Sequence, residues 1–254
     1  MKAKQKRHHK RGEEHRRERR DFHIIYEDQD LIVVLKEAGV LSVPFKGGRA
    51  RNLLDLVKNM LERKHERALV VHRIDRFTSG LLVFAKNKRA REGLVAQFRA
   101  HTPRREYIAL VRGAPPAESG ELKDYLRLSK DGFRQQVVRN RKDGDLAHLK
   151  YRVVASSPEI SLVRVRLVTG LKNQIRVQFV KAGCPIVGDR HYAGYEEHEQ
   201  GIKRQALHAV LLGFRHPITD EYLEFIAPPT KDMHKLMHSV GMLWDEKAFR
   251  AREV

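Results

Sequence analysis

The sequence predicts an α+β fold: a single catalytic domain built on a large mixed, mainly antiparallel sheet with flanking helices. Short runs rich in β-branched residues recur along the chain between turn-forming residues, which is typical of strands. Alternation of apolar and polar residues over 148–168 favours antiparallel strands with one face in water. Because 41% of the 254 residues are apolar, the chain can bury a sizeable core, and we expect the domain to span residues 22–254.

The first half of the domain opens with two predicted strands, FHIIYE and DLIVVLK, joined by a polar turn. The next segment, residues 52–65, has apolar residues at the i, i+3/i+4 spacing of an amphipathic helix, and Asn52 is its expected N-cap. Two strand-like runs, ALVV and LLVFAK, then lie on either side of residues 72–80. After them, Asn87 is placed to cap a helix that runs through Leu94–Phe98.

The second half is dominated by strands. EYIALVRG predicts a strand, a polar stretch follows to about Gly144, and the alternating runs HLKYRVV and SLVRVRLV predict an antiparallel pair. Residues 173–183 predict a short helix closed by Gly183. ALHAVLLGF and YLEFIAP close the sheet, and a helix with Met233, Leu236 and Met237 on one face is expected to end the chain.

The charge of the chain is strongly positive, with 51 lysines and arginines against 32 acids and a net charge of +19. Such a balance points first to nucleic acid as partner and second to an anionic membrane surface. Residues 1–21 form a basic N-terminal segment, in which the first twenty hold ten Lys/Arg and three Glu, and we expect them to be disordered. The segment is either a flexible arm that grips phosphates or a solvated tail.

Several classes of protein are disfavoured. The chain has no Walker A loop, no GxGxxG, no G-x-S-x-G and no H-E-x-x-H motif. A lone cysteine, Cys184, excludes an intramolecular disulfide and a zinc ribbon, and the scattered histidines support no metal site. No apolar run approaches the length of a membrane span, and no secretory signal is visible, so we expect a cytoplasmic protein.

One acid stands out. Asp75 lies in HRIDRFTSG between Arg73 and Arg76, and apolar runs flank the segment. Nearby guanidinium groups favour the ionised form of a carboxyl, so Asp75 is a candidate nucleophile or general base rather than a general acid. The alternative is an ordinary ion pair that stabilises the fold.

Three further segments are candidates for a site. TGLKNQIR follows a strand and opens a helix, a geometry that presents N–H groups to anions. Arg176 near the start of this helix either has a specific partner or is an ordinary surface arginine. Tyr107 is either a core residue or an aromatic platform for a base. In GCPIVGDRHY, Asp189 is placed to cap or brace a loop that we expect to be structural.

Together these segments resemble the RluA-type pseudouridine synthases. HRIDRFTSGLLVFAKN is similar to the family's catalytic motif, and REYIALVRG to its tyrosine-containing strand. TGLKNQIRVQFVKAGCPIVGDRHYAG, and LHAVLLGFRHP with YLEFIAPP, resemble the third and closing blocks. Four blocks in the same order cover most of the chain from Phe22 to about Pro229 and make the resemblance specific.

The resemblance implies an isomerase that converts uridine in RNA to pseudouridine, without cofactor or metal, in a fold with a central cleft. It implies that Asp75 is the catalytic carboxylate, and that Tyr107 stacks on the target uracil. By the same resemblance Arg176 pairs with Asp75, while Arg73 fills the gap left by a flipped nucleotide.

The sequence departs from the family at several positions. Leu171, which Lys172 follows, Asn173 and Gln178 replace residues that are common there, and KEAG replaces the more usual KPxG near the start. These changes put RNA contacts in doubt rather than the chemistry. We expect no N-terminal S4 domain, a monomer, and an rRNA or tRNA substrate, with rRNA slightly favoured. The rival functions are a non-catalytic RNA-binding factor on the same fold and a metal-dependent nuclease, which would need clustered carboxylates.

Overall fold

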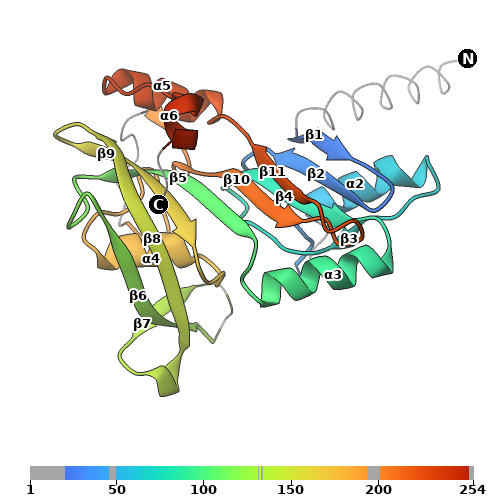
Figure 1. Ribbon diagram of the computed structural model, residues 1–254. Helices are drawn as coiled ribbons and strands as arrows, with labels where there is room; N and C mark the ends of the chain where they lie inside the picture. Colours follow the sequence, from blue (N-terminus) through green and yellow to red (C-terminus); the bar gives the residue numbers. More distant parts are fainter. Residues whose placement is uncertain (1–20, 46–49, 131, 133, 194–200, 252–254) are drawn as a thin grey trace, which may run out of the picture. The chain divides into compact units, whose positions relative to one another are not determined.

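The computed structural model describes residues 21–45, 50–130, 132, 134–193 and 201–251 (Figure 1). The basic segment expected over residues 1–21 therefore lies outside the described residues, apart from Asp21. That residue accepts a hydrogen bond from Nε of Arg51 at 2.5 Å. The described chain divides into two compact units. Unit 1 runs up to Phe98 and includes residues 215–221, and unit 2 comprises residues 99–214 and 222–254.

Unit 1 contains a small antiparallel sheet. Its strand β4 pairs with β2, and β2 with β1, in a register that sets Leu31 opposite Ala85 and Phe22 opposite Lys36. Every residue of β4 is buried, as its continuous apolar sequence predicts. The short β3 also pairs with β4. The bounds are β1 Phe22–Glu27, β2 Leu31–Lys36, β3 Leu69–Val70 and β4 Ser79–Ala85.

Both helices of unit 1 begin at the predicted caps. The side chain of Asn52 accepts the N–H of Asp55 at 3.0 Å and starts α2 (Leu53–Glu62). Likewise, Oδ1 of Asn87 accepts the N–H of Ala90 at 2.9 Å at the start of α3 (Lys88–Arg99). The predicted apolar face of α2 is buried, so the periodicity in the sequence located this helix correctly.

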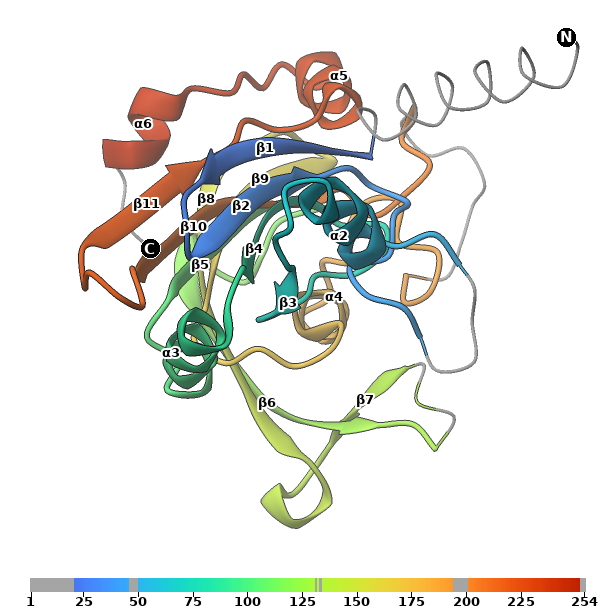
Figure 2. The same ribbon diagram turned by 90° about the vertical axis from the view of Figure 1, so that its right-hand side faces the viewer.

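Unit 2 is built on an antiparallel sheet with the strand order β11-β10-β5-β9-β8-β6-β7. Helix α4 packs on one face, where Phe179 meets the ring of Tyr151, and α6 packs on the other, where Phe249 covers Arg164 (Figure 2). The strands are β5 Arg104–Arg112, β6 Ser119–Leu128, β7 Gln135–Val138, β8 Asp145–Ser156, β9 Ile160–Leu167, β10 Leu207–Arg215 and β11 Tyr222–Ile226. The helices are η1 Arg141–Asp143, α4 Gln174–Lys181, α5 Lys231–Ser239 and α6 Glu246–Ala251.

The α+β class is confirmed. The polar stretch before Gly144, to which the sequence analysis assigns no element, contains β6 and β7. Charged side chains on β6 hide the alternation of this strand, while its backbone pairs with β8 over residues 119–126. The helix with Met233, Leu236 and Met237 is α5, but it does not end the chain, since α6 follows. The single catalytic domain over residues 22–254 stays a prediction.

A buried ion pair holds β5 to β9. Nε of Arg164 lies 2.5 Å from Oε2 of Glu106, and Nε of Arg104 lies 2.7 Å from Oε1. The Glu106 side chain is fully enclosed and that of Arg164 is only 1% exposed. Removing one charge would leave the guanidinium of Arg164 buried without its carboxylate.

We expect Glu106→Gln to lower the free energy of unfolding by about 3–5 kcal/mol, the usual cost of breaking a buried pair. Denaturant titration measures this change. Glu121→Gln is the control, because Glu121 lies at the surface beside Lys123 and Lys150 and its loss should barely change Tm. Equal free energies of unfolding for the two variants would contradict a stabilising role for the buried pair of Glu106 and Arg164.

Candidate functional site

The segment 72–80 forms the loop between β3 and β4, and buried polar groups fix its backbone. The fully buried ammonium of Lys36 donates to the carbonyl oxygens of Glu37 at 2.9 Å, Val40 at 2.8 Å and Arg76 at 3.0 Å. Ser42 donates its hydroxyl to the carbonyl of Ile74 at 2.6 Å and accepts the N–H of Ile74 at 3.1 Å. Residues on both sides of Asp75 are therefore tied to the segment 36–42.

Asp75 itself is half-buried, and its carbonyl accepts the N–H of Thr78 at 3.1 Å in a tight turn. The expectation that both neighbouring arginines act on this carboxylate stays a prediction, and the structure gives Arg76 two other contacts. Nε of Arg76 donates to the carbonyl of Gly39 at 2.9 Å, and its guanidinium lies 5.3 Å from the centroid of the Phe77 ring. Arg73 is exposed. The loop conformation thus directs Arg76 toward the backbone, where it helps to hold the loop.

His72 has a structural role at the start of the motif. Its Nε2 accepts the N–H of Val83 at 3.2 Å, and its ring stacks on Phe98 with the centroids 4.4 Å apart. An imidazole nitrogen that accepts an N–H carries no proton. The ring therefore links the loop to β4 and α3.

Tyr107 lies on β5 in unit 2, only 8% exposed. The strand register places it beside Val165 and Tyr151, on the face of the sheet that α4 covers. Its neighbour Arg105, which has no assignment from the sequence, is also buried, and burial lowers the pKa of this guanidinium. A Cβ on Gly170 would lie 2.4 Å from the Nη1 atom of Arg105. The glycine of the TGLKNQIR motif therefore leaves room for the guanidinium in its present position.

Arg176 has the specific partner that its position predicts, and within unit 2 that partner is Asp189. Its Nε and Nη2 atoms each lie 2.7 Å from one carboxylate oxygen of Asp189. Nη1 donates to Oδ1 of Asn173 at 3.1 Å, and the guanidinium lies 4.9 Å from the centroid of the Tyr192 ring. The side chain of Asp189 is fully buried and that of Arg176 is 6% exposed. This bidentate pair fixes the plane of the guanidinium.

The turn before α4 depends on Gln174 and on an unusual backbone conformation. Oε1 of Gln174 accepts the hydroxyl of Thr169 at 2.9 Å and the N–H of Leu171 at 3.0 Å. Asn173 has φ of 53°, a left-handed conformation that asparagine tolerates better than most residues. Its side-chain amide donates to the Tyr192 hydroxyl at 2.9 Å. Asn173 therefore forms the turn with its backbone, while its side chain donates to Tyr192 and accepts from Arg176.

A further departure from the family pattern, Gln178, and the neighbouring Lys172 also make contacts within unit 2. Nζ of Lys172 donates to the carbonyl of Gly132 at 2.6 Å. Nε2 of the buried Gln178 donates to Asp124 at 2.8 Å and to the carbonyl oxygens of Leu122 and Ala147. Both side chains support β6 and its turn, which gives the departure at Gln178 a structural explanation.

The loop 183–192 is structural, as predicted, and Asp189 braces it by accepting the N–H of His191 at 3.1 Å. Cys184 in the same loop is 1% exposed, and burial raises the pKa of its thiol to about 11. The sequence suggested a bracing role for Asp189 but did not identify Arg176 as its partner.

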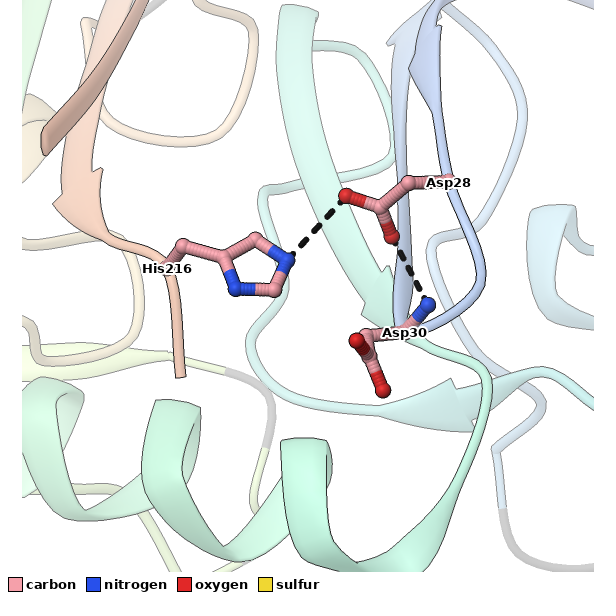
Figure 3. A group of neighbouring side chains, drawn as sticks. All are labelled: Asp28, Asp30 and His216. Carbon is pink, nitrogen blue, oxygen red and sulfur yellow. Dashed lines mark hydrogen bonds and ion pairs between the residues drawn. The ribbon is translucent and has the colours of Figure 1, made fainter. Parts of the chain in front are cut away.

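One group of residues has the composition of a metal site. Oxygen and nitrogen atoms of Asp28, Asp30 and His216 lie within 4.8 Å of one another in unit 1 (Figure 3). Nδ1 of His216 accepts the N–H groups of Ile218 and Thr219, so its ring proton is on Nε2, which donates to Asp28 at 3.1 Å.

The two carboxylates of this group are also engaged. Oδ1 of Asp28 accepts the N–H groups of Asp30 and Leu31, and Oδ1 of Asp30 accepts Nδ2 of Asn87 at 2.7 Å. Although burial by itself raises the pKa of Asp28, the bonds from Leu31 and Asp30 outweigh it and lower the pKa. These contacts show that the three side chains have a structural role, which is to hold the β1–β2 turn against residues 216–219.

Of the proposed site residues, the structure places Asp75 and Arg73 in unit 1, and Tyr107 and Arg176 in unit 2. The pairing of Asp75 with Arg176 stays a prediction. The structural role of Lys36 could have been inferred from the sequence, because a lysine in the apolar run LIVVLK must find polar partners when it is buried. Within the described ranges, the helices are too short or too polar to cross a lipid bilayer.

Comparison with known proteins gives consistent matches. The profile of the family described as RNA pseudouridylate synthase matches residues 30–181. The dual-specificity RNA pseudouridine synthase RluA of Escherichia coli is 35% identical over 206 residues, which cover 81% of this chain and 92% of that protein. The uncharacterized RNA pseudouridine synthase YlyB of Bacillus subtilis is 36% identical over 225 residues, covering 87% and 73%.

Among solved structures, human RNA pseudouridylate synthase domain containing 4 is similar in fold, with a TM-score of 0.71 at 22% identity. The match covers 85% of this chain and 92% of the human chain. Fold and sequence together define an RNA pseudouridine synthase. The chain belongs to the RluA-type family, as its four sequence blocks predict, and is therefore an isomerase that converts uridine in RNA to pseudouridine.

We expect Asp189→Asn to lower kcat by about a hundredfold, because a guanidinium that loses its fixed plane is misplaced by an ångström or more. Single-turnover assays of pseudouridine formation, run well below the Tm of the variant, measure the effect. Asp124→Asn is the matched control, since Asp124 is also buried and binds the same helix α4, but through Lys181 and Gln178 rather than Arg176. An equal loss of turnover in both variants would show that Asp189→Asn acts by general destabilisation and not through the orientation of Arg176.

We also expect pseudouridine formation to persist in excess EDTA, because protein groups engage the candidate ligand atoms of Asp28, Asp30 and His216. The assay compares rates with chelator alone and with chelator followed by added Mg²⁺ or Zn²⁺. A loss of activity that added metal restores would contradict this prediction.

Proposed function

We propose that Asp75 is the catalytic carboxylate of this isomerase. The supporting observation is its setting: Asp75 is half-buried on a loop whose neighbouring residues, Ile74 and Arg76, are both held by buried polar groups. A carboxylate fixed in this way loses little conformational freedom when it meets a substrate. The match of HRIDRFTSG to the family's catalytic motif gives the same assignment.

The proposed reaction breaks the bond between N1 of uracil and C1′ of ribose, and uracil departs with the bonding electron pair. Asp75 either attacks C1′ or removes a ribose proton to give a glycal. The base then turns so that C5 faces C1′ and forms the new carbon–carbon bond, and loss of the C5 proton completes the isomerisation. Asp75 is regenerated, so the overall reaction needs no oxidant, reductant or second substrate.

Three further residues have proposed roles. Tyr107, on the strand beside Arg105, stacks on the uracil ring and assists a proton transfer. Arg176 pairs with Asp75 and keeps it ionised. Asp189 and Asn173 hold the plane of this guanidinium, which fixes the direction in which the side chain can meet a carboxylate. Arg73, exposed two residues before Asp75, fills the gap left when the nucleotide flips out of its helix.

We propose structured RNA as the substrate, with rRNA favoured over tRNA. Support comes from a similar protein of Zymomonas mobilis, 34% identical over 225 residues, named ribosomal large subunit pseudouridine synthase D. The Escherichia coli relative is named a dual-specificity RNA pseudouridine synthase, a name that specifies no single class of RNA, and tRNA is the alternative substrate. We propose further that the enzyme acts as a monomer in the cytoplasm.

The decisive test is Asp75→Asn. The amide has nearly the same shape as the carboxylate but is not a nucleophile or base at neutral pH, so kcat should fall by at least about a thousandfold. RNA affinity should stay within a few-fold of the wild type, because the remaining contacts are retained. Tritium release from RNA labelled at C5 of uridine, together with filter binding, measures both quantities.

The matched control is Asp143→Asn, which removes an exposed carboxylate from η1 and should leave kcat unchanged. Substantial turnover by the Asp75 variant, with normal turnover by the control, would exclude a catalytic role for Asp75. It would leave the family assignment of the chain intact.

A further inference from the structure

The hairpin of β6 and β7, with η1 after it, carries a group of exposed cations. In unit 2, Figures 1 and 2 show β6 and β7 extending away from the end of the sheet that α5 and α6 cover. The register pairs Tyr125 with Val138 and Leu128 with Gln135. We call this segment, residues 119–145, the basic hairpin. Six exposed cations follow the midpoint of β6, and we call them the tip cations: Arg127, Lys130, Arg134, Arg139, Arg141 and Lys142.

The charges at the base of the basic hairpin are neutralised, whereas those toward its tip are not. At the base, Glu121 lies 2.5 Å from Lys123 and 3.2 Å from Lys150, and Asp124 pairs with Lys181. Among the described residues, none of the six tip cations forms an ion pair, and neither do the nearby Asp143 and Asp145. In the described part of this segment, six exposed cations against the two acids Asp143 and Asp145 therefore present a net positive charge to water.

The basic hairpin is also firmly attached to the helix that bears Arg176. The hydroxyl of Tyr192 accepts the N–H of Gln135 at 2.9 Å and the side-chain amide of Asn173 at 2.9 Å. The buried side chains of Leu126 and Ala147 pack against Val177 of α4. The cations of the basic hairpin thus have a fixed position relative to α4. This lowers the entropy cost of binding a ligand that contacts both the hairpin and the helix.

We propose that the basic hairpin binds phosphates of the substrate RNA outside the reacting nucleotide. The family makes RNA the substrate, and RNA is the polyanion that complements six exposed cations on a rigid support, none of which pairs with an acid of the described chain. Four of the six are arginines, whose planar guanidinium groups bind phosphate oxygens in pairs. The inference rests on the RNA substrate alone and does not depend on the proposed role of Asp75.

The test uses the variant Arg139→Gln, Arg141→Gln, Lys142→Gln in the full chain. A phosphate contact contributes about 0.7–0.9 to the slope of log Kd against log salt, so the slope should fall by about two. At physiological salt KM should rise about tenfold or more, while kcat at saturating RNA stays unchanged.

The matched control is Lys231→Gln, Lys235→Gln, Lys247→Gln, which removes the same charge from exposed positions on α5 and α6. It should keep the wild-type slope and KM. Far-UV circular dichroism of both triple variants checks that the fold is retained. A slope equal to that of the control would overturn the proposal and leave the cations as a solvated surface.

Substrate length gives a second readout. With a short oligonucleotide that holds only the target loop, wild type and hairpin variant should have nearly equal KM values, because the contacted phosphates are absent. With the same loop on an extended stem the values should separate. Equal KM ratios on both substrates, or a loss of kcat, would overturn the proposal, as would salt-sensitive binding of the wild type to phosphatidylserine vesicles without a change in RNA affinity for the variant.

Discussion

A buried ammonium group fixes the geometry on which the rest of the proposed active loop depends. Lys36 ends an apolar strand and is fully enclosed, so its charge must be balanced by dipoles within the protein. Three carbonyl groups do this, and one of them belongs to Arg76, directly after Asp75. With Ser42 on the other side, the loop has little freedom to relax. The same requirement that a buried charge be satisfied thus produces a rigid backbone at the site.

In unit 2 the buried charge of Arg176 is balanced by an ion pair instead of backbone dipoles. Arg176 lies where the helix dipole does not favour a cation, and the buried Asp189 compensates for this. Asn173 and Tyr192 complete its surroundings. In both units the side chains with proposed catalytic roles therefore stand on elements fixed by buried polar contacts, which is the preorganisation that electrostatic catalysis requires.

The features predicted from sequence are those that local physics decides. Asn52 and Asn87 cap helices because their side chains reach N–H groups three residues ahead, and the apolar run of β4 is buried as its composition requires. Strand β6 was missed because pairing with β8, far along the chain, holds its polar residues in place. The contact of Arg76 with the Gly39 carbonyl could not be predicted for a similar reason, since the position of that carbonyl is set by tertiary packing.

The enclosed thiol of Cys184 has a practical consequence. Only the thiolate reacts readily with maleimides and similar reagents, and a pKa of about 11 keeps this group protonated at neutral pH. The natural chain is therefore nearly silent to thiol labelling under native conditions. A cysteine introduced at an exposed position such as Arg139 would be the dominant reactive site, so a fluorescent reporter can be attached without replacing any natural cysteine.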